Sequence, residues 1–201
     1  METFTSHRKR PRTRGFGLIE AMIAIFILAF GLLALAGVMA QLSQGGTRSR
    51  YMSTEAVLAS EKLDDLNRFP ALDPAIAVPN GISAGSLDTD ITQTVGALNT
   101  TVDYFDTVQI SSGNGAMQET IKQTDGAGNL IYTTTTHAPD GTVTTTNTAA
   151  PPQATSDMVT YHRRWIIENN VPVPGARRIT VAVLQDNGSP RAQFQSSLVR
   201  Q

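Results

Sequence analysis

The stretch FGLIEAMIAIFILAFGLLALAGVMA, residues 16–40, decides the fold of the N-terminal part of the chain. Residues 21–40 carry no charged side chain. A helix of that length rises about 30 Å, which matches the hydrocarbon core of a lipid bilayer. The stretch therefore predicts a membrane-spanning helix.

Glu20 is an unexpected residue near the beginning of this apolar run. A charged side chain in hydrocarbon costs about 2.5–3.5 kcal/mol on insertion scales. One interpretation is that the carboxylate reaches the headgroups near the helix end and has no further role. The other is that an opposite charge meets it in the membrane, which would make Glu20 a functional residue.

The basic residues are concentrated ahead of the span. Positive charge on one side of a membrane helix keeps that side in the cytoplasm, so we expect the rest of the chain to cross the membrane. A secretory signal peptide is the alternative, but its apolar region is usually about 7–15 residues long and is not expected to contain an acidic residue. The basic residues before Phe16 are Arg8, Lys9, Arg10, Arg12 and Arg14.

The remainder of the chain is acidic and has no cysteine. Lys and Arg number 16 and Asp and Glu 17 in the whole sequence, so without the first fifteen residues 11 basic and 16 acidic residues remain. A net charge near −5 argues against binding to nucleic-acid phosphates, which relies on clustered Lys and Arg. The absence of cysteine excludes disulfides, thiolate catalysis and Cys-ligated metals.

The sequence around the start of the span resembles the class III signal of type IV pilins and pseudopilins, with Gly15 before an aromatic Phe16 and an acidic Glu20 five positions into the mature chain. The resemblance implies that a prepilin peptidase cuts between Gly15 and Phe16 and methylates the new amine of Phe16. Glycine suits the position before the cut because it lacks a Cβ. The resemblance also implies that the Glu20 carboxylate pairs with the Phe16 amine of a neighbouring subunit.

Gly31 and Gly37 distinguish this span from that of major pilins, which commonly have a proline near the position of Gly37. Glycine lowers helix stability by about 1 kcal/mol relative to alanine, so the two glycines can soften the helix during filament assembly. The alternative is that they allow close packing against neighbouring helices. Both interpretations stay open.

An amphipathic helix is predicted to continue the span to residue 67, although Gly45 and Gly46 are a point where it can bend. Pro70 and Pro74 end it, because proline does not fit a helix interior. Glu61, Asp64 and Asp65 are expected on its solvated face. The apolar stripe that repeats at steps of four and three is Met52, Ala56, Ala59, Leu63 and Leu66.

The middle of the chain shows weaker patterns. Residues 71–100 have no sustained period and predict an irregular connection, whereas residues 101–110, TVDYFDTVQI, predict a strand. Asp125-Gly126 and Asp140-Gly141 lie between threonine-rich runs and predict two hairpins. The tract 142–156 is alternatively a flexible or glycosylated segment.

Three alternating segments near the C-terminus predict an antiparallel meander. Val159, Tyr161, Trp165 and Ile167 share one face of the first strand, interrupted by Arg163. Ile179, Val181 and Val183 share one face of the second, and Phe194, Ser196 and Leu198 one face of the third. The order of these segments resembles the C-terminal sheet of PilV-type minor pilins. The sheet needs cover on one face, which the amphipathic helix can supply.

The sequence contains no recognisable catalytic or metal-binding motif. The three histidines, His7, His137 and His162, lie far apart in sequence, and no pairing of a nucleophile with a base is apparent. His162 is expected to be solvated and Trp165 to be a core residue. We therefore expect no enzyme activity, no cofactor and no metal.

The predicted fold is α+β: a long N-terminal transmembrane and amphipathic helix packed on a C-terminal antiparallel β-sheet, as in type IV pilins. The segments are a cleaved cytoplasmic leader (1–15), the transmembrane half of the helix (16–42), its periplasmic amphipathic half (43–69), a variable loop and hairpin region (70–157) and the C-terminal sheet (158–201).

The resemblance implies a structural minor pilin of a type IV pilus in a Gram-negative bacterium, which helps to initiate assembly or modifies the filament tip. Its implied partners are prepilin peptidase, other minor pilins, the major pilin, the inner-membrane assembly platform and inner-membrane lipid, with no nucleic acid. The alternatives are a minor pseudopilin of type II secretion and a surface-binding or DNA-binding module displayed on a pilus. We expect a single-pass inner-membrane protein with a periplasmic C-terminal part, which then enters the filament.

Overall fold

The computed structural model describes residues 17–95, 100–124, 127–186 and 193–200. Gly15, Phe16 and the predicted Asp125-Gly126 turn lie outside these residues. The chain divides into two compact units, residues 1–47 and residues 48–201, which are described separately below. We call the second the C-terminal unit.

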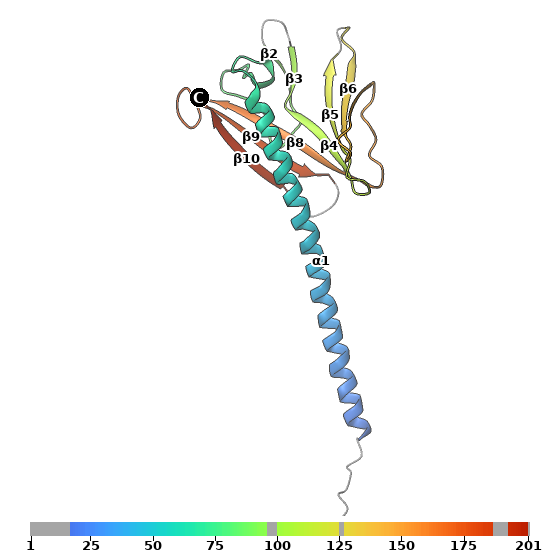
Figure 1. Cartoon of the computed structure of the whole chain (residues 1–201). Helices are drawn as coiled ribbons and strands as arrows, with labels where there is room; N and C mark the ends of the chain where they lie inside the picture. The colour runs from blue at the N-terminus through green and yellow to red at the C-terminus, as the bar shows by residue number, and fades with distance from the viewer. Residues whose placement is uncertain (1–16, 96–99, 125–126, 187–192, 201) are drawn as a thin grey trace, which may run out of the picture. The chain divides into compact units, whose positions relative to one another are not determined.

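A single helix, α1 (Leu18–Arg68), begins the described chain (Figure 1). The helical backbone continues through Gly45 and Gly46. Its N-terminal part is long and apolar enough to cross a membrane, as predicted from the charge-free run. The helix ends two residues before Pro70, where proline prevents its continuation.

In the C-terminal unit, the described residues form the outer part of α1, a short 3-10 helix and ten strands (Figure 1). All strand pairs are antiparallel, which confirms the predicted α+β class. The bounds are η1 (Pro74–Ile76), β1 (Ser83–Gly85), β2 (Thr92–Val95), β3 (Thr100–Asp103), β4 (Phe105–Ser111), β5 (Met117–Thr124), β6 (Leu130–His137), β7 (Val143–Thr148), β8 (Met158–Asn169), β9 (Arg177–Gln185) and β10 (Gln193–Arg200).

The main sheet has the strand order β10-β9-β8-β4-β5-β6-β7, with β1 paired to β8 and a separate β2-β3 pair. The predicted C-terminal meander is confirmed as β8-β9-β10. The two predicted hairpins are confirmed as β5-β6 and β6-β7, so residues 143–148 of the threonine-rich tract form a strand. Both groups of strands belong to one sheet because β4 pairs with β8.

The expectations for residues 71–110 were partly wrong. The segment expected to be irregular contains β1 and β2, which have three and four residues and are too short to show a period. The predicted strand at 101–110 is divided into β3 and β4 at Tyr104. This residue is fully buried, and its hydroxyl donates to the Ala77 carbonyl at 2.8 Å. The tertiary contacts of one side chain therefore override a continuous strand pattern.

The core lies between the outer part of α1 and one face of the sheet. The predicted helix stripe is correct at Ala59, Leu63 and Leu66, but Met52 is 39% exposed and the buried face includes Glu55 and Leu58 instead. The helix side of the core contacts a set of buried residues on β4, β8 and β9: Val108, Tyr161, Trp165, Ile167, Ile179, Val181 and Val183.

Gly85 allows an unusually close approach between β1 and β8. Its φ is +83°, and an added Cβ would lie 2.2 Å from the Trp165 carbonyl oxygen and 2.8 Å from the Cβ of Tyr104. A side chain at this position would clash with backbone atoms that cannot move without disturbing the sheet. The close approach holds β1 against the strand that carries Trp165.

Candidate assembly helix and buried ion network

Glu20, the residue that the sequence singles out in the membrane segment, lies in the first turn of α1. Its backbone N–H donates to the Gly17 carbonyl at 2.9 Å. The positive end of the helix dipole favours a carboxylate at this position. The side chain is exposed and makes no ion pair with the residues described by the structure.

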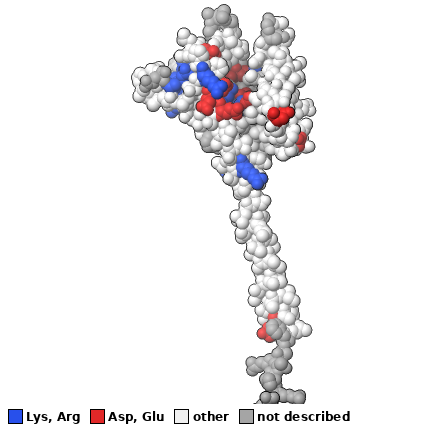
Figure 2. All heavy atoms as spheres, in the orientation of Figure 1, with Lys and Arg blue, Asp and Glu red and all other residues white. Residues whose placement is uncertain are grey.

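Residues 21–40 of α1 present apolar side chains on all sides. Residues 21–47 include no charged residue, and Figure 2 shows this part of the helix as an almost uninterrupted uncharged surface. None of the span's residues is buried within the chain. This surface is suited to lipid or to the helices of other subunits, since both cover apolar side chains.

Gly31 and Gly37 lie within the continuous helix. Apart from the neighbouring helix backbone, no atom of the described residues lies within 4 Å of the position that a Cβ would take at either residue. The softening and close-packing interpretations both stay predictions.

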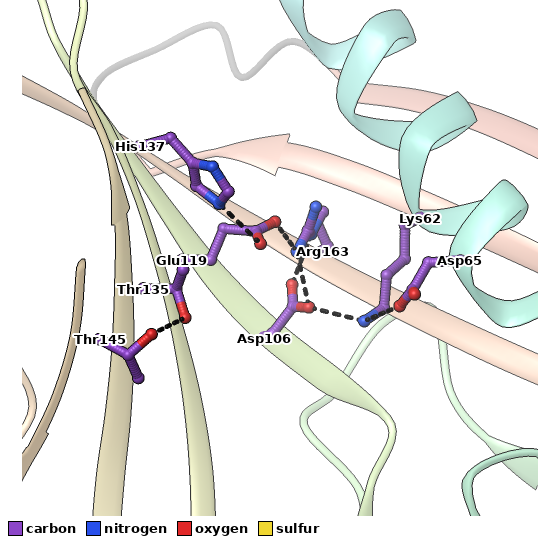
Figure 3. Close-up of polar contacts among 8 residues, drawn as sticks. All are labelled: Lys62, Asp65, Asp106, Glu119, Thr135, His137, Thr145 and Arg163. Atoms are coloured by element: carbon purple, nitrogen blue, oxygen red, sulfur yellow. Dashed lines mark hydrogen bonds and ion pairs between the residues drawn. The ribbon is translucent and has the colours of Figure 1, made fainter. Parts of the chain in front are cut away.

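A group of charged side chains is buried between α1 and the sheet in the C-terminal unit (Figure 3). Arg163 on β8 donates from Nε and Nη2 to both carboxylate oxygens of Asp106 on β4, at 2.6 and 2.8 Å. Its Nη2 also donates to Glu119 on β5 at 2.7 Å. Lys62 on α1 reaches the same Asp106 carboxylate at 3.0 Å. We call these four residues the buried ion network.

Burial and charge act in opposite directions on the pKa values of this network. Burial alone would raise the pKa of Asp106, but the charges and hydrogen bonds of Lys62 and Arg163 outweigh it and lower the pKa below its usual range. Burial would lower the pKa of Arg163, yet Asp106 and Glu119 raise it. Both Asp106 and Arg163 therefore favour the charged form, so this pair carries fixed charges at neutral pH.

Lys62 links the network to the apolar core. Its Nζ lies 4.4 Å from the centre of the Trp165 ring, which is the distance of a cation–π contact. The same Nζ lies 3.6 Å from Asp65 on the next turn of α1. Lys62 thus contacts the helix, a strand carboxylate and the core tryptophan, and it fastens the C-terminal end of α1 to the sheet.

Glu55 is a second buried charge on α1 that sequence analysis missed. Its exposure is 0%, and among the residues that the structure describes neither carboxylate oxygen has a hydrogen-bond partner. Burial raises its pKa, and proximity to the Gln185 backbone reduces that effect. Glu55, Ala59, Lys62 and Leu66 follow one another at steps of four, three and four residues, which places them on one side of the helix. This spacing was the available signal.

The remaining sequence candidates are placed as follows. Trp165 is a core residue as predicted, and His162 is half-buried, with Nε2 3.4 Å from Asp186. His137 lies 4.0 Å from Glu119, at the edge of the network, and His7 lies outside the described residues.

Glu61, Asp64 and Asp65 on α1 are exposed as predicted. Within the described residues, no three His, Asp or Glu side chains are placed to hold a metal ion.

Comparison with known proteins gives one informative match. Residues 10–36 match the family described as the prokaryotic N-terminal methylation motif. No curated protein matches the chain significantly, and no solved structure does. The match covers the segment that contains Gly15, Phe16 and Glu20, and the rest of the chain is not included in it. Together, the methylation motif, the membrane-compatible helix and the antiparallel sheet that its outer part covers support a type IV pilin-like protein.

Proposed function

We propose that this protein is a structural minor pilin of a type IV pilus, which helps to initiate assembly or modifies the filament tip. The observation that carries the proposal is the N-terminal methylation motif, placed at the start of a continuous apolar helix. A helix of this kind can reside in the inner membrane and afterwards exchange lipid for the helices of other subunits. The C-terminal part would lie in the periplasm before assembly.

Processing is the first step of the proposed mechanism. Prepilin peptidase would remove residues 1–15 and methylate the amine of Phe16. A free α-amine has a reference pKa of about 7.7–8.0 and is largely cationic at neutral pH, and methylation keeps the charge. The leader must be removed before this cation exists, which makes cleavage a condition for assembly.

Charge pairing is the second step. Glu20 is free of ion pairs within the part of the chain that the structure describes, and it lies on a helix surface that can contact another subunit. The Phe16 amine of a neighbouring subunit would match its charge in the low-dielectric filament interior, where an unpaired carboxylate is costly. Pairing therefore favours the assembled state over a single chain in lipid.

The buried ion network supports the third step, extraction from the membrane. A force applied through α1 has to pass to the sheet without pulling the helix away from it. Lys62 contacts both Asp106 and Trp165, and Arg163 ties Asp106 to Glu119 on the adjoining strand. These contacts join α1 to three strands of the sheet, so the C-terminal unit would move with the helix.

A minor pseudopilin of type II secretion is the second candidate, because the methylation motif is common to both machineries in the resemblance stated above. A surface-binding module on a pilus is a further alternative. Other minor pilins, the major pilin and the inner-membrane assembly platform are the proposed partners. Recovery of the protein in sheared pili, with normal protein secretion in a strain lacking it, distinguishes the pilus role from the secretion role.

Replacing Glu20 by alanine tests the proposed mechanism. We expect the variant to insert and to be cleaved normally, as measured by intact mass, but to be depleted from sheared pili. Glu61→Ala is the matched control, since it removes an exposed carboxylate from the same helix outside the span. Normal incorporation of the Glu20 variant would refute charge pairing. A native chain that still carries residues 1–15 would refute the pilin class.

A further inference from the structure

Arg177 and Arg200 form a like-charged pair at the ends of two adjacent strands. They are directly opposite each other in the β9-β10 ladder. Like charges at directly opposed positions destabilise a sheet. Within the described part of the chain neither arginine makes an ion pair, whereas the next residue, Arg178, pairs with Glu168 at 2.7 Å. Among the described residues, the pair therefore carries two positive charges without a compensating carboxylate.

Both arginines donate hydrogen bonds to backbone carbonyls of the segment that follows α1. Arg200 Nη1 donates to the Phe69 carbonyl at 3.0 Å, just beyond the end of α1. Arg177 Nη1 donates to the Ala71 carbonyl at 3.0 Å, and its Nε donates to Asn169 Oδ1 at 3.1 Å. These bonds fix both side chains against the segment that follows the end of α1. They do not neutralise the two charges.

A cavity of about 240 Å³ lies between these side chains and the β8-β9 loop. Asn169, Asn170 and Ala71 line it together with the two arginines, and none of the lining residues that the structure describes is acidic. A guanidinium has five N–H donors, so each arginine keeps about three for a ligand. The cavity thus offers hydrogen-bond donors and positive charge at one place.

We propose that this cavity binds a small oxyanion, a phosphate or a carboxylate, between Arg177 and Arg200. Two guanidiniums with spare donors match the paired oxygens of such a group. Binding would remove the repulsion across the β9-β10 ladder. Burial and the Arg200 charge lower the pKa of Arg177, which agrees with a site that lacks its counter-charge. The inference concerns the isolated chain and does not depend on the filament function.

The test is titration calorimetry on the full chain in neutral detergent micelles, with sodium phosphate, sulfate or acetate as the probe and sodium chloride at equal ionic strength as the reference. We expect saturable binding of at least one oxyanion. We also expect the unfolding midpoint to rise by about 3–6 °C at ten times Kd. Preference for phosphate and sulfate would assign a tetrahedral anion, and preference for acetate a carboxylate, and both results support the site.

Two variants and a control make the test specific. Arg177→Gln and Arg200→Gln should each weaken binding at least tenfold. Arg178→Gln removes the same charge from the neighbouring position on the opposite face of β9 and should bind like the native chain. Far-UV circular dichroism at the titration temperature establishes that each variant is folded. No saturable binding by the native chain, or equal binding by all three variants, would overturn the proposal.

Discussion

Asp106→Asn is the change that most directly probes how α1 is held against the sheet. The substitution keeps the size of the side chain and removes its charge. Lys62 and Arg163 would then lose their shared carboxylate, and the Arg163 side chain is only 3% exposed. Removing one partner of a buried ion pair typically costs about 3–5 kcal/mol, because the other charge is left uncompensated. For a unit of this size that corresponds to a fall of about 6–20 °C in Tm.

The fluorescence of Trp165 provides the assay. It is the one tryptophan of the chain, it is buried in the core, and its ring contacts Lys62. Thermal unfolding of the full chain in detergent, followed through this residue, reports on the C-terminal unit rather than on the membrane segment. Asp65→Asn is the control, since Asp65 pairs with the same lysine but its side chain is 52% exposed. An exposed pair contributes about 0.2–1 kcal/mol.

The pH dependence gives a second, independent readout. Because the folded-state pKa of Asp106 is lowered, its stabilising contribution is present above the unfolded pKa and is lost as the pH falls through the folded value. The difference in Tm between the native chain and Asp106→Asn should therefore become smaller when the pH falls below about 4. A Tm within 2 °C of the control at pH 7 would show that the network does not hold the helix, and the reasoning would fail.

Two further predictions concern single residues of the C-terminal unit. Glu55→Gln should raise the free energy of unfolding at neutral pH by about 1–3 kcal/mol, because a buried carboxylate without a partner is replaced by a neutral group. Because burial raises the pKa of Glu55, the native chain regains stability at acid pH. The gain in free energy of unfolding from Glu55→Gln should therefore grow as the pH rises through that pKa. A gain that does not depend on pH would contradict the interpretation of Glu55 as a buried carboxylate. Gly85→Ala should destabilise by about 2–4 kcal/mol in thermal unfolding, since its Cβ would meet the Trp165 carbonyl in a left-handed backbone conformation. Gly81→Ala, which also has a positive φ but open space around it, is the control, and equal losses would show that the clash is unimportant.

Long periodic segments were predictable from the sequence because they contain the same signal many times. The charge-free run and the stripe at Ala59, Leu63 and Leu66 were sufficient for α1, and alternation over β8, β9 and β10 was sufficient for the meander. Strands β1 and β2 have too few residues to alternate visibly. Their pairing depends on contacts with distant residues, such as that of Ala84 with Ile167.

The buried ion network could be predicted only in part. Arg163 was visible as a charged residue that interrupts an apolar strand face, but no local pattern identifies its partner. Asp106 lies 57 positions away in sequence. It shares one face of the extended backbone with the buried residues Tyr104 and Val108, whereas a solvent-facing residue would lie on the opposite face. The helix partner, Lys62, looks like an ordinary surface lysine until the sheet is placed against it. Partner choice in such a network is set by the tertiary fold.

The main effect of the buried ion network is to fix the position of α1 along the sheet, more than to add stability. Apolar residues such as Leu63 and Leu66 would remain covered if α1 slid along the sheet, since apolar contacts are not directional. A slide of one helical turn, about 5.4 Å, would instead remove Lys62 from Asp106 and leave buried charges unpaired. The charges therefore fix which residues of α1 the sheet covers. In the proposed pilin role α1 would transmit force to the sheet, and resistance to sliding would then be the property that matters. Directional buried contacts supply it where apolar contacts alone do not.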